Sequence, residues 1–217
     1  MTTSELALPR VTPRSRRKLD QILQAARQLF FKQGFAATTM EAVAKEAGVS
    51  KATLYAYFKS REMLFGAAVG ALDNHYTASL ISGATTPGDI REKLLRFAKD
   101  ILELLLHPQT IAAYRTVVSE SARFPEISEA FYVNGARRLL DRLEGFFAAA
   151  MATGALRSAP PDRAAEQFIG VIRGDLMLRA LLSVKSKREN DDADAIIASG
   201  VDVFYRAYRP EESGSGK

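Results

Sequence analysis

The short stretch from residue 47 to residue 59 carries the side chains whose types and spacing point most directly to chemistry. Gly48 suits a tight turn because it lacks a Cβ atom, and Ser50 is a favourable N-cap for the helix that follows. On that helix Leu54 and Phe58 fall on one face. The other face carries hydrogen-bonding side chains, namely Lys51, Thr53, Tyr55 and Tyr57. A short helix that packs by its back and exposes polar groups can enter the major groove of DNA, so the predicted chemistry is hydrogen bonding to bases and phosphates.

Positive charge is concentrated in the first quarter of the chain, although the whole sequence has a net charge of +5. Residues 1–60 contain ten Lys or Arg and four Asp or Glu, a net charge of +6, and the remaining 157 residues sum to −1. A basic segment joined to a near-neutral body indicates a polyanion-binding head on a body with another task. On composition alone, a basic tail that only aids solubility remains the alternative.

Catalysis, metal binding and redox chemistry find little support in the residue types. The chain contains no Cys, which excludes a disulfide scaffold and a thiolate metal site. The two histidines, His75 and His107, lack the spacing of a metal pair. The terminal Gly-Ser-Gly-Lys follows no predicted strand, so it is not a phosphate-binding loop. We therefore expect no enzyme, no catalytic residue, no metal and no cofactor.

Composition favours a helical protein with a substantial core. The chain has 217 residues, of which 47% are hydrophobic, and that fraction comes mainly from Ala, Leu and Phe, which favour helix over strand. No apolar run approaches the roughly 20 residues needed to span a bilayer. Residues 1–11 lack the apolar stretch of a signal peptide. We expect a cytoplasmic protein without a membrane partner.

Two helices before the short polar helix and one after it must hold it in place. Apolar residues recur at spacings of three and four over residues 19–30, which predicts a helix that ends at Gly34. Thr38 is predicted to cap the next helix, with Glu41 at capping-box spacing. Ser60 is expected to cap a fourth helix that leads into the rest of the chain.

Prolines and glycines divide the remainder into further predicted helices. They follow a linker at 82–88 and are expected at 89–106, 109–122, 126–153, 162–185 and 192–208. No strand alternation is found, so the predicted fold class is all-α, with about nine helices. We divide the chain into an arm with a three-helix helix-turn-helix domain (1–60), a helical body (61–210) and a disordered tail (211–217).

The N-terminal region resembles the DNA-binding signature of the tetracycline-repressor (TetR) family. The resemblance runs from Ile22 to Phe65 in the stretch ILQAARQLFFKQGFAATTMEAVAKEAGVSKATLYAYFKSREMLF. It rests on Phe-x-x-x-Gly-Phe at the end of the first helix, the Thr-Thr opening, the Ala-Gly-Val-Ser turn and Leu-Tyr-x-Tyr-Phe. Residues 114–131 and 166–179 are similar to the AefR-like subgroup. The resemblance implies that the body is a ligand-binding and dimerisation bundle.

Matching positions imply where DNA would be contacted. The expected DNA-binding residues are Arg16, Arg17, Thr39, Lys51, Ala52, Thr53, Tyr55, Tyr57 and Lys59. Thr39 and Lys59 would meet phosphate, and the two arginines would follow the backbone or the minor groove. Alternatives stay open, because Tyr55 could pack in the core, Thr39 could act only as a cap, and the arginines could be solvated. The family often has His at position 57 and a larger residue at position 56, so the operator sequence stays open.

A ligand pocket in the body would use polar or amphipathic side chains within apolar helices. The candidates are His107, Tyr114, Arg115, Phe131, Tyr132, Phe168 and Arg173. For each candidate a purely structural role is the alternative, since aromatic residues at helical spacing commonly belong to a core.

The last two helices are predicted to form a four-helix bundle between two copies of the chain. The penultimate helix is apolar on more than one face, which indicates burial against its own subunit and against a partner. Gly170 and Gly174 would allow close helix approach. The expected interface residues are Gly170, Gly174, Leu178, Leu181, Ile197, Val201 and Phe204. A purely intramolecular core is the alternative.

The resemblance implies a ligand-responsive transcriptional regulator, a homodimer that binds a palindromic double-stranded DNA operator and leaves it when an inducer of unknown identity binds. Two heads would enter successive major grooves, about 34–36 Å apart. The helix after Ser60 would act as the lever between body and head. Two alternatives remain, namely an architectural DNA-binding protein without a ligand, and an activator in place of a repressor.

Overall fold

The computed structural model describes residues 13–76, 88–184 and 193–210, and every element within these ranges is helical. The predicted all-α class is confirmed. The predicted arm, most of the linker, the loop before the last helix and the tail lie outside the described residues. Among the described helices, none is both long and apolar enough to cross a membrane. The helices are α1 (Pro13–Gln33), α2 (Met40–Glu46), α3 (Lys51–Tyr57), α4 (Arg61–Tyr76), α6 (Ile90–Leu106), α7 (Pro108–Glu120), α8 (Pro125–Phe131), the π-helical turn η1 (Tyr132–Ala136), α9 (Arg137–Ala152), α10 (Pro161–Arg173), α11 (Leu176–Leu182) and α12 (Ala193–Tyr208).

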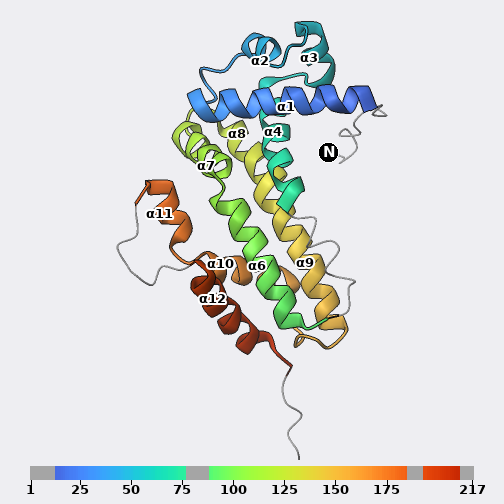
Figure 1. Ribbon diagram of the computed structural model, residues 1–217, viewed down its shortest axis with the longest axis vertical. Coiled ribbons are helices and arrows are strands. Elements are labelled where there is room, and N and C mark those ends of the chain that lie inside the picture. The colour runs from blue at the N-terminus through green and yellow to red at the C-terminus, as the bar shows by residue number, and fades with distance from the viewer. Residues whose placement is uncertain (1–12, 77–87, 185–192, 211–217) are drawn as a thin grey trace, which may run out of the picture.

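The molecule consists of a small head set across one end of an elongated body (Figure 1). Helix α1 lies across the top of the body, and α2 and α3 pack on its outer side. Helix α4 leaves the head and enters the body next to α8 and η1. Helices α6 and α9 run along the length of the body, and α10 and α12 lie at the end away from the head.

Local capping explains the short helices of the head. Gly34 and Gly48 adopt φ angles of +87° and +64°, which confirms both as turn residues. The predicted cap of α2 is wrong by one residue, because Thr39 is the N-cap and its hydroxyl accepts the Ala42 amide at 3.1 Å. Thr38 is fully buried, and its hydroxyl donates to the Gly34 carbonyl at 2.8 Å.

The single helix predicted at 126–153 is interrupted by a turn of π-helix between α8 and α9. This wider turn packs closely against α4. A Cβ atom at Gly66 would lie 2.8 Å from Asn134 Nδ2, and one at Gly70 would lie 3.3 Å from the Asn134 carbonyl oxygen. Two glycines four residues apart therefore let α4 approach η1, and no larger side chain fits there without displacing Asn134.

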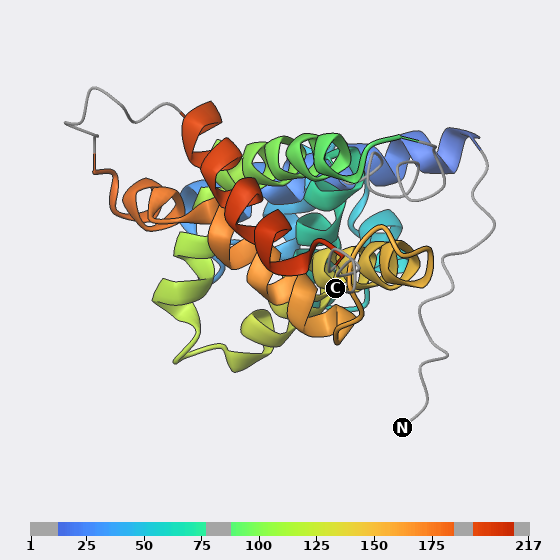
Figure 2. The same cartoon turned by 90° about the horizontal axis from the view of Figure 1, so that it is seen from below.

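The single helix predicted at 162–185 is wrong, because Gly174 adopts a φ angle of +45° and separates α10 from α11. Gly174 therefore ends a helix, and close helix approach occurs at another glycine. A Cβ atom at Gly200 would lie 2.7 Å from the Val171 carbonyl oxygen. Figure 2, which looks along the body, shows α12 crossing beside α10.

Buried side chains form two clusters, and the boundary between them does not fall at residue 60. The first cluster joins the head to the beginning of α4, and it also includes Val117 of α7 and Ile127 of α8. The second fills the body around Phe97, Phe147 and Phe168. Body residues complete the hydrophobic core of the head. A movement of α7 or α8 therefore changes the packing of the head core.

Candidate nucleic-acid interface and cavity

Helix α3 is fixed by its back and exposes its front. Ser50 caps it by accepting the Thr53 amide at 3.0 Å. Leu54 is fully buried and Phe58 is 5% exposed, so both side chains anchor the helix on the head core. The outward face carries Lys51, Ala52, Tyr55 and Ala56, all of which are exposed. The two alanines leave room for close approach, and the lysine and tyrosine supply the hydrogen-bonding groups that contact with base edges requires.

Lys51 and Tyr55 present a cation and a phenol side by side. Tyr55 is 37% exposed and does not pack in the core. The Lys51 ammonium lies 6.0 Å from the centre of the Tyr55 ring and forms an ion pair with Glu41 of α2. The hydrogen bond from Lys51 holds the pKa of Glu41 below its ordinary value, and the same bond raises the pKa of Lys51. Lys51 therefore stays charged at neutral pH, and its exposed ammonium can exchange the carboxylate for a phosphate.

Tyr57 and Thr53 are less free than Tyr55. The Tyr57 ring is half-buried, and its hydroxyl donates to the Ser15 carbonyl at 3.2 Å, which ties the end of α3 to the beginning of α1. The Thr53 hydroxyl lies 2.8 Å from that of Ser50. Among the residues of α3 predicted to face DNA, Lys51, Ala52 and Tyr55 are exposed. Thr53 and Tyr57 instead form hydrogen bonds that hold the helix in place.

The remaining predicted DNA contacts lie on the surface of the head. Arg16 and Arg17 in the first turns of α1 are exposed, and so are Thr39 and Lys59. Thr39 accepts the Ala42 amide, and its hydroxyl donates to the Glu41 carboxylate, so it must leave that carboxylate to donate to a phosphate.

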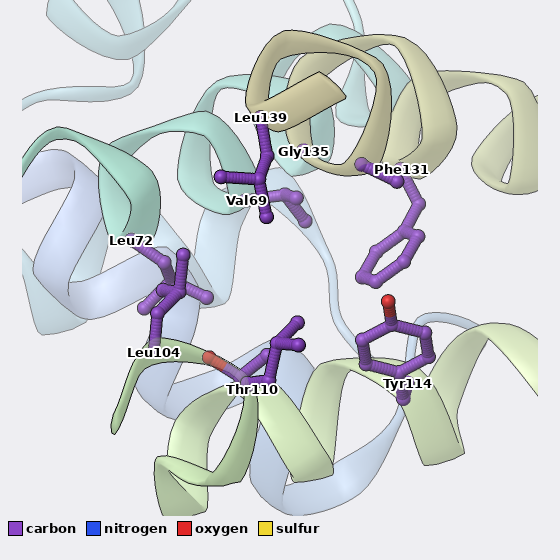
Figure 3. A pocket seen from close by; sticks show the side chains of 10 residues that line it. Val69, Leu72, Leu104, Thr110, Tyr114, Phe131, Gly135 and Leu139 are labelled. Carbon is purple, nitrogen blue, oxygen red and sulfur yellow. The ribbon is translucent and has the colours of Figure 1, made fainter. Parts of the chain in front are cut away.

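A small apolar cavity of about 50 Å³ lies in the body where α4, α6, α7 and η1 meet (Figure 3). It is lined by Val69, Leu72, Leu104, Leu105, Thr110, Tyr114, Phe131, Gly135, Ala136 and Leu139. The rings of Tyr114 and Phe131 meet edge to face at 4.7 Å, and the Tyr114 hydroxyl points toward Phe131 (Figure 3). Burial raises the pKa of Tyr114, so this phenol stays protonated and can donate a hydrogen bond.

Thr110 gives the cavity an unsatisfied polar atom. The residue is 7% exposed, and its hydroxyl has no hydrogen-bond partner among the described residues. Leaving a buried hydroxyl without a partner costs on the order of 1–3 kcal/mol. A ligand with a hydroxyl or carbonyl group would recover that free energy.

Of the seven predicted ligand residues, Tyr114 and Phe131 line this cavity and the other five lie elsewhere. His107 caps α7 through Nδ1, which accepts the Gln109 amide at 3.2 Å. Arg115 donates to the Ala180 and Leu181 carbonyls at the end of α11. Phe168 lies in the body core, whereas Tyr132 and Arg173 face outward. Of these five, His107 lines a second cavity of about 440 Å³ between α6 and the start of α12, and the other four occupy core, surface or hydrogen-bonding positions outside both cavities.

The cavity residues that sequence reasoning missed are mainly aliphatic. Leu104, Leu139 and Val69 carry no sequence signal that separates them from ordinary core residues. Thr110 could have been noticed as a β-branched polar residue on the apolar face of its helix, one turn before Tyr114.

The predicted interface residues also divide into two groups. Ile197, Val201 and Phe204 are at most 4% exposed and belong to the core of the single chain, so they have no surface to offer a partner. Their stripe on α12 packs on α10 and α6 of the same chain, and Phe204 also meets Phe147 of α9. Gly170, Gly174 and Leu178 are exposed, and Leu181 is half-buried against the body core.

Two family models match the chain. The model for bacterial regulatory proteins of the tetR family matches residues 22–68. The model for the C-terminal domain of AefR-like transcriptional repressors matches residues 92–210, which is more than half of the sequence.

Proteins and solved structures similar to this chain are also named as regulators. The HTH-type regulator YvkB of Bacillus subtilis (strain 168) is 23% identical over 194 residues, which cover 83% of this chain and 95% of YvkB. The solved structure of the flavonoid-responsive regulator FrrA is 38% identical with a TM-score of 0.70, and the match covers 91% of this chain and all of that one. A TetR-family regulator from Mesorhizobium loti MAFF303099 has a TM-score of 0.77 at 24% identity over 91% of this chain and 100% of its own, which is a likeness of fold. YvkB and the Mesorhizobium loti protein are named as transcriptional regulators, FrrA is named as a regulator, and none of the three is named as an enzyme.

Proposed function

Because the chain belongs to the tetR family of bacterial regulatory proteins, with an AefR-like C-terminal domain, we propose that it is a ligand-responsive repressor of transcription. It binds a palindromic DNA operator as a homodimer and leaves the operator when a small molecule occupies its body. The observation that carries the proposal is the outward face of α3, where Lys51 and Tyr55 are exposed while Leu54 is fully buried. Because bacterial operator DNA lies in the cytoplasm, the proposed function implies a cytoplasmic location.

Helix α3 reads the major groove, and the surrounding cations hold the phosphate backbone. Tyr55 presents a phenolic hydroxyl to base edges, and Lys51 beside it reaches a base or the nearest phosphate. Arg16, Arg17 and Lys59 are exposed on the same head and supply sequence-independent affinity. The bond from Tyr57 to Ser15 sets the angle between α3 and α1, so Tyr57 supports the reading helix.

The dimer uses the outward sides of α10, α11 and α12. On α11, Leu178 and Leu182 lie one turn apart and are 59% and 64% exposed, and Val203 of α12 is 56% exposed. Large exposed apolar side chains on these helices favour contact with a partner. A Cβ atom at Gly170 would meet nothing within 4 Å, so α10 offers a smooth surface for close approach by a second chain.

The inducer is a flat, mostly apolar molecule with hydroxyl or carbonyl groups. The cavity walls are aliphatic and aromatic, with polar atoms supplied by Thr110 and Tyr114. The similar regulator FrrA is named as flavonoid-responsive, and flavonoids have this chemistry. Since drug-sized ligands occupy pockets of roughly 300–1,000 Å³, such a molecule must widen a cavity of about 50 Å³. Widening of the cavity separates α7 from η1, so ligand binding changes the positions of these helices.

Operator binding is tested on the DNA upstream of the gene that encodes the protein. DNase I footprinting locates the site, and fluorescence anisotropy measures affinity for wild type, Tyr55→Ala and the control Tyr132→Ala, an exposed tyrosine of the body. We expect Tyr55→Ala to weaken binding at least tenfold and Tyr132→Ala to leave it unchanged. Equal affinities for all three proteins would refute the assignment of α3 as the reading helix.

Induction is tested separately with a panel of flavonoids and other hydroxylated aromatic compounds. A compound that binds the cavity should lower operator affinity in wild type and act more weakly on Thr110→Val, which lacks the unsatisfied hydroxyl. If no compound weakens operator binding, the repressor-release part of the proposal is wrong while DNA binding stands.

A further inference from the structure

The carboxylate of Glu120, the last residue of α7, holds two consecutive backbone amides of the head. Its Oε1 accepts the Phe35 amide at 2.7 Å, and its Oε2 accepts the Ala36 amide at 2.7 Å. Both amides lie in the turn between α1 and α2. Hydrogen bonds to an ionised acceptor are roughly twice as strong as neutral ones. We call this pair of bonds the Glu120 clasp.

The turn is shaped to receive the carboxylate. Gly34 adopts a φ angle of +87°, and a Cβ atom at this position would lie 2.5 Å from Glu120 Oε1. Gly34 therefore serves two purposes, because it ends α1 and leaves space for an acidic side chain from the body.

Helices α4 and α8 hold the same turn from other directions. The Arg61 guanidinium of α4 lies 4.1 Å from the centre of the Phe35 ring and donates to the Thr38 carbonyl at 3.1 Å. The Phe35 ring also meets Phe124, just before α8, at 5.2 Å and Phe65 of α4 at 5.6 Å. A movement of this turn therefore also changes its contacts with α4 and with Phe124.

The other end of α7 lines the cavity. Thr110 and Tyr114 lie on this helix, and Glu120 follows Thr110 by ten residues, or about 15 Å along a helix axis. Between them, the Thr116 hydroxyl reaches the Phe30 carbonyl of α1 at 3.4 Å. A continuous α-helix moves largely as a rod, so displacement at the cavity end reaches the clasp.

We infer that Glu120 is a positioning residue that fixes the head on the body and makes α7 a link from the cavity to the DNA-binding helices. The inference rests on the proposed function, because it takes the cavity as the ligand site. A ligand that separates Tyr114 from Phe131 shifts α7, and the clasp draws the Phe35–Ala36 turn with it. The turn leads directly into α2, so α2 and α3 change their angle to the body. The sequence alone predicts this lever role for the helix after Ser60.

A double-mutant cycle tests the link without an identified ligand. Ala136→Met fills the cavity from η1, and Glu120→Gln replaces one acceptor oxygen of the clasp by an NH₂ group that faces an amide donor. Operator affinity is measured for wild type, both single variants and the double variant. We expect Ala136→Met to weaken binding about tenfold in the wild-type background, within the range typical of allosteric coupling, and less than twofold in the Glu120→Gln background. The matched control is Glu129→Gln, an exposed carboxylate on α8, which should leave the effect of Ala136→Met intact.

The outcomes separate this inference from the proposed function. Additive effects in the cycle, or no effect of Ala136→Met in the wild-type background, overturn the link while operator binding by wild type stands. Failure of wild type to bind any operator overturns the proposed function instead.

Hydrogen exchange gives a second measurement that requires no DNA. In Glu120→Gln the amides of Phe35 and Ala36 should exchange at least tenfold faster than in wild type, while the amides of α9 stay unchanged. If each of the two amides exchanges at the same rate in Glu120→Gln as in wild type, the Glu120 carboxylate does not protect them and the clasp is refuted.

Discussion

Replacing Lys59 by Gln should make operator binding less sensitive to salt by a calculable amount. Lys59 is exposed on the head, together with Arg16, Arg17 and Lys51. If each of these four cations meets one phosphate, a dimer neutralises eight phosphates. Each neutralised phosphate adds about −0.9 to the slope of log K against log salt concentration, so wild type should show a slope of about −7.

The variant loses one contact in each head, and its slope should become about −5. Between 50 and 200 mM salt, wild-type affinity should then fall by about 2 × 10⁴-fold and that of Lys59→Gln by about 2 × 10³-fold. Thermal stability should change little, because Lys59 is an exposed side chain that lies outside the two buried clusters.

Fluorescence anisotropy with the footprinted operator at several KCl concentrations measures both slopes. The matched control is Lys99→Gln, which removes the same charge from α6 of the body and should leave the slope at its wild-type value. A Lys59→Gln slope equal to that of wild type would refute the phosphate contact. If Lys99→Gln reduces the slope of log K against log salt concentration as much as Lys59→Gln does, net charge and not position governs the salt dependence.

Three further predictions concern the body. Phe168→Ala should lower the free energy of unfolding in urea by about 3–5 kcal/mol, because Phe168 is a fully buried core residue; a change below 1 kcal/mol would contradict that placement. Gly200→Ala should destabilise the chain by about 1–3 kcal/mol, since its Cβ would crowd a carbonyl at 2.7 Å, whereas Gly170→Ala, with open space, should leave urea unfolding of the protomer unchanged or slightly stabilised. Burial raises the pKa of Tyr114, so the folded state keeps its proton longer than the unfolded state, and stability should fall as the pH rises above about 10. The loss of stability above about pH 10 should be smaller in Tyr114→Phe than in wild type. Identical curves of unfolding free energy against pH for the two proteins would contradict the raised pKa of Tyr114.

Sequence reasoning succeeded where the structure depends on neighbours along the chain. Gly34 and Gly48 were identified as turn residues because positive φ angles at helix ends favour glycine. Ser50 was identified as a cap because its hydroxyl meets an amide three residues later. The cap of α2 was misplaced by one residue, since Thr38 and Thr39 have the same side chain and burial decides which one caps.

It failed where the outcome depends on which helices pack together. Phe168 and Tyr114 look alike in sequence as aromatic residues within apolar helices, yet one is in the core and the other borders a cavity. Gly170 and Gly200 are both helical glycines, but the approach of α10 makes only the latter sterically indispensable of the two.

The sequence by itself determined the helix-turn-helix head, its charge and the outward face of α3. These features follow from hydrogen bonds and side-chain periodicity that reach about four residues along a helix. The tertiary structure decided the cavity, the surface left for a partner and the Glu120 clasp. Glu120 lies 85 residues from Phe35 in sequence, and no local pattern records that their helices meet. The pairing of distant elements is set by the fit of whole buried faces, and it therefore emerges only when the chain is packed.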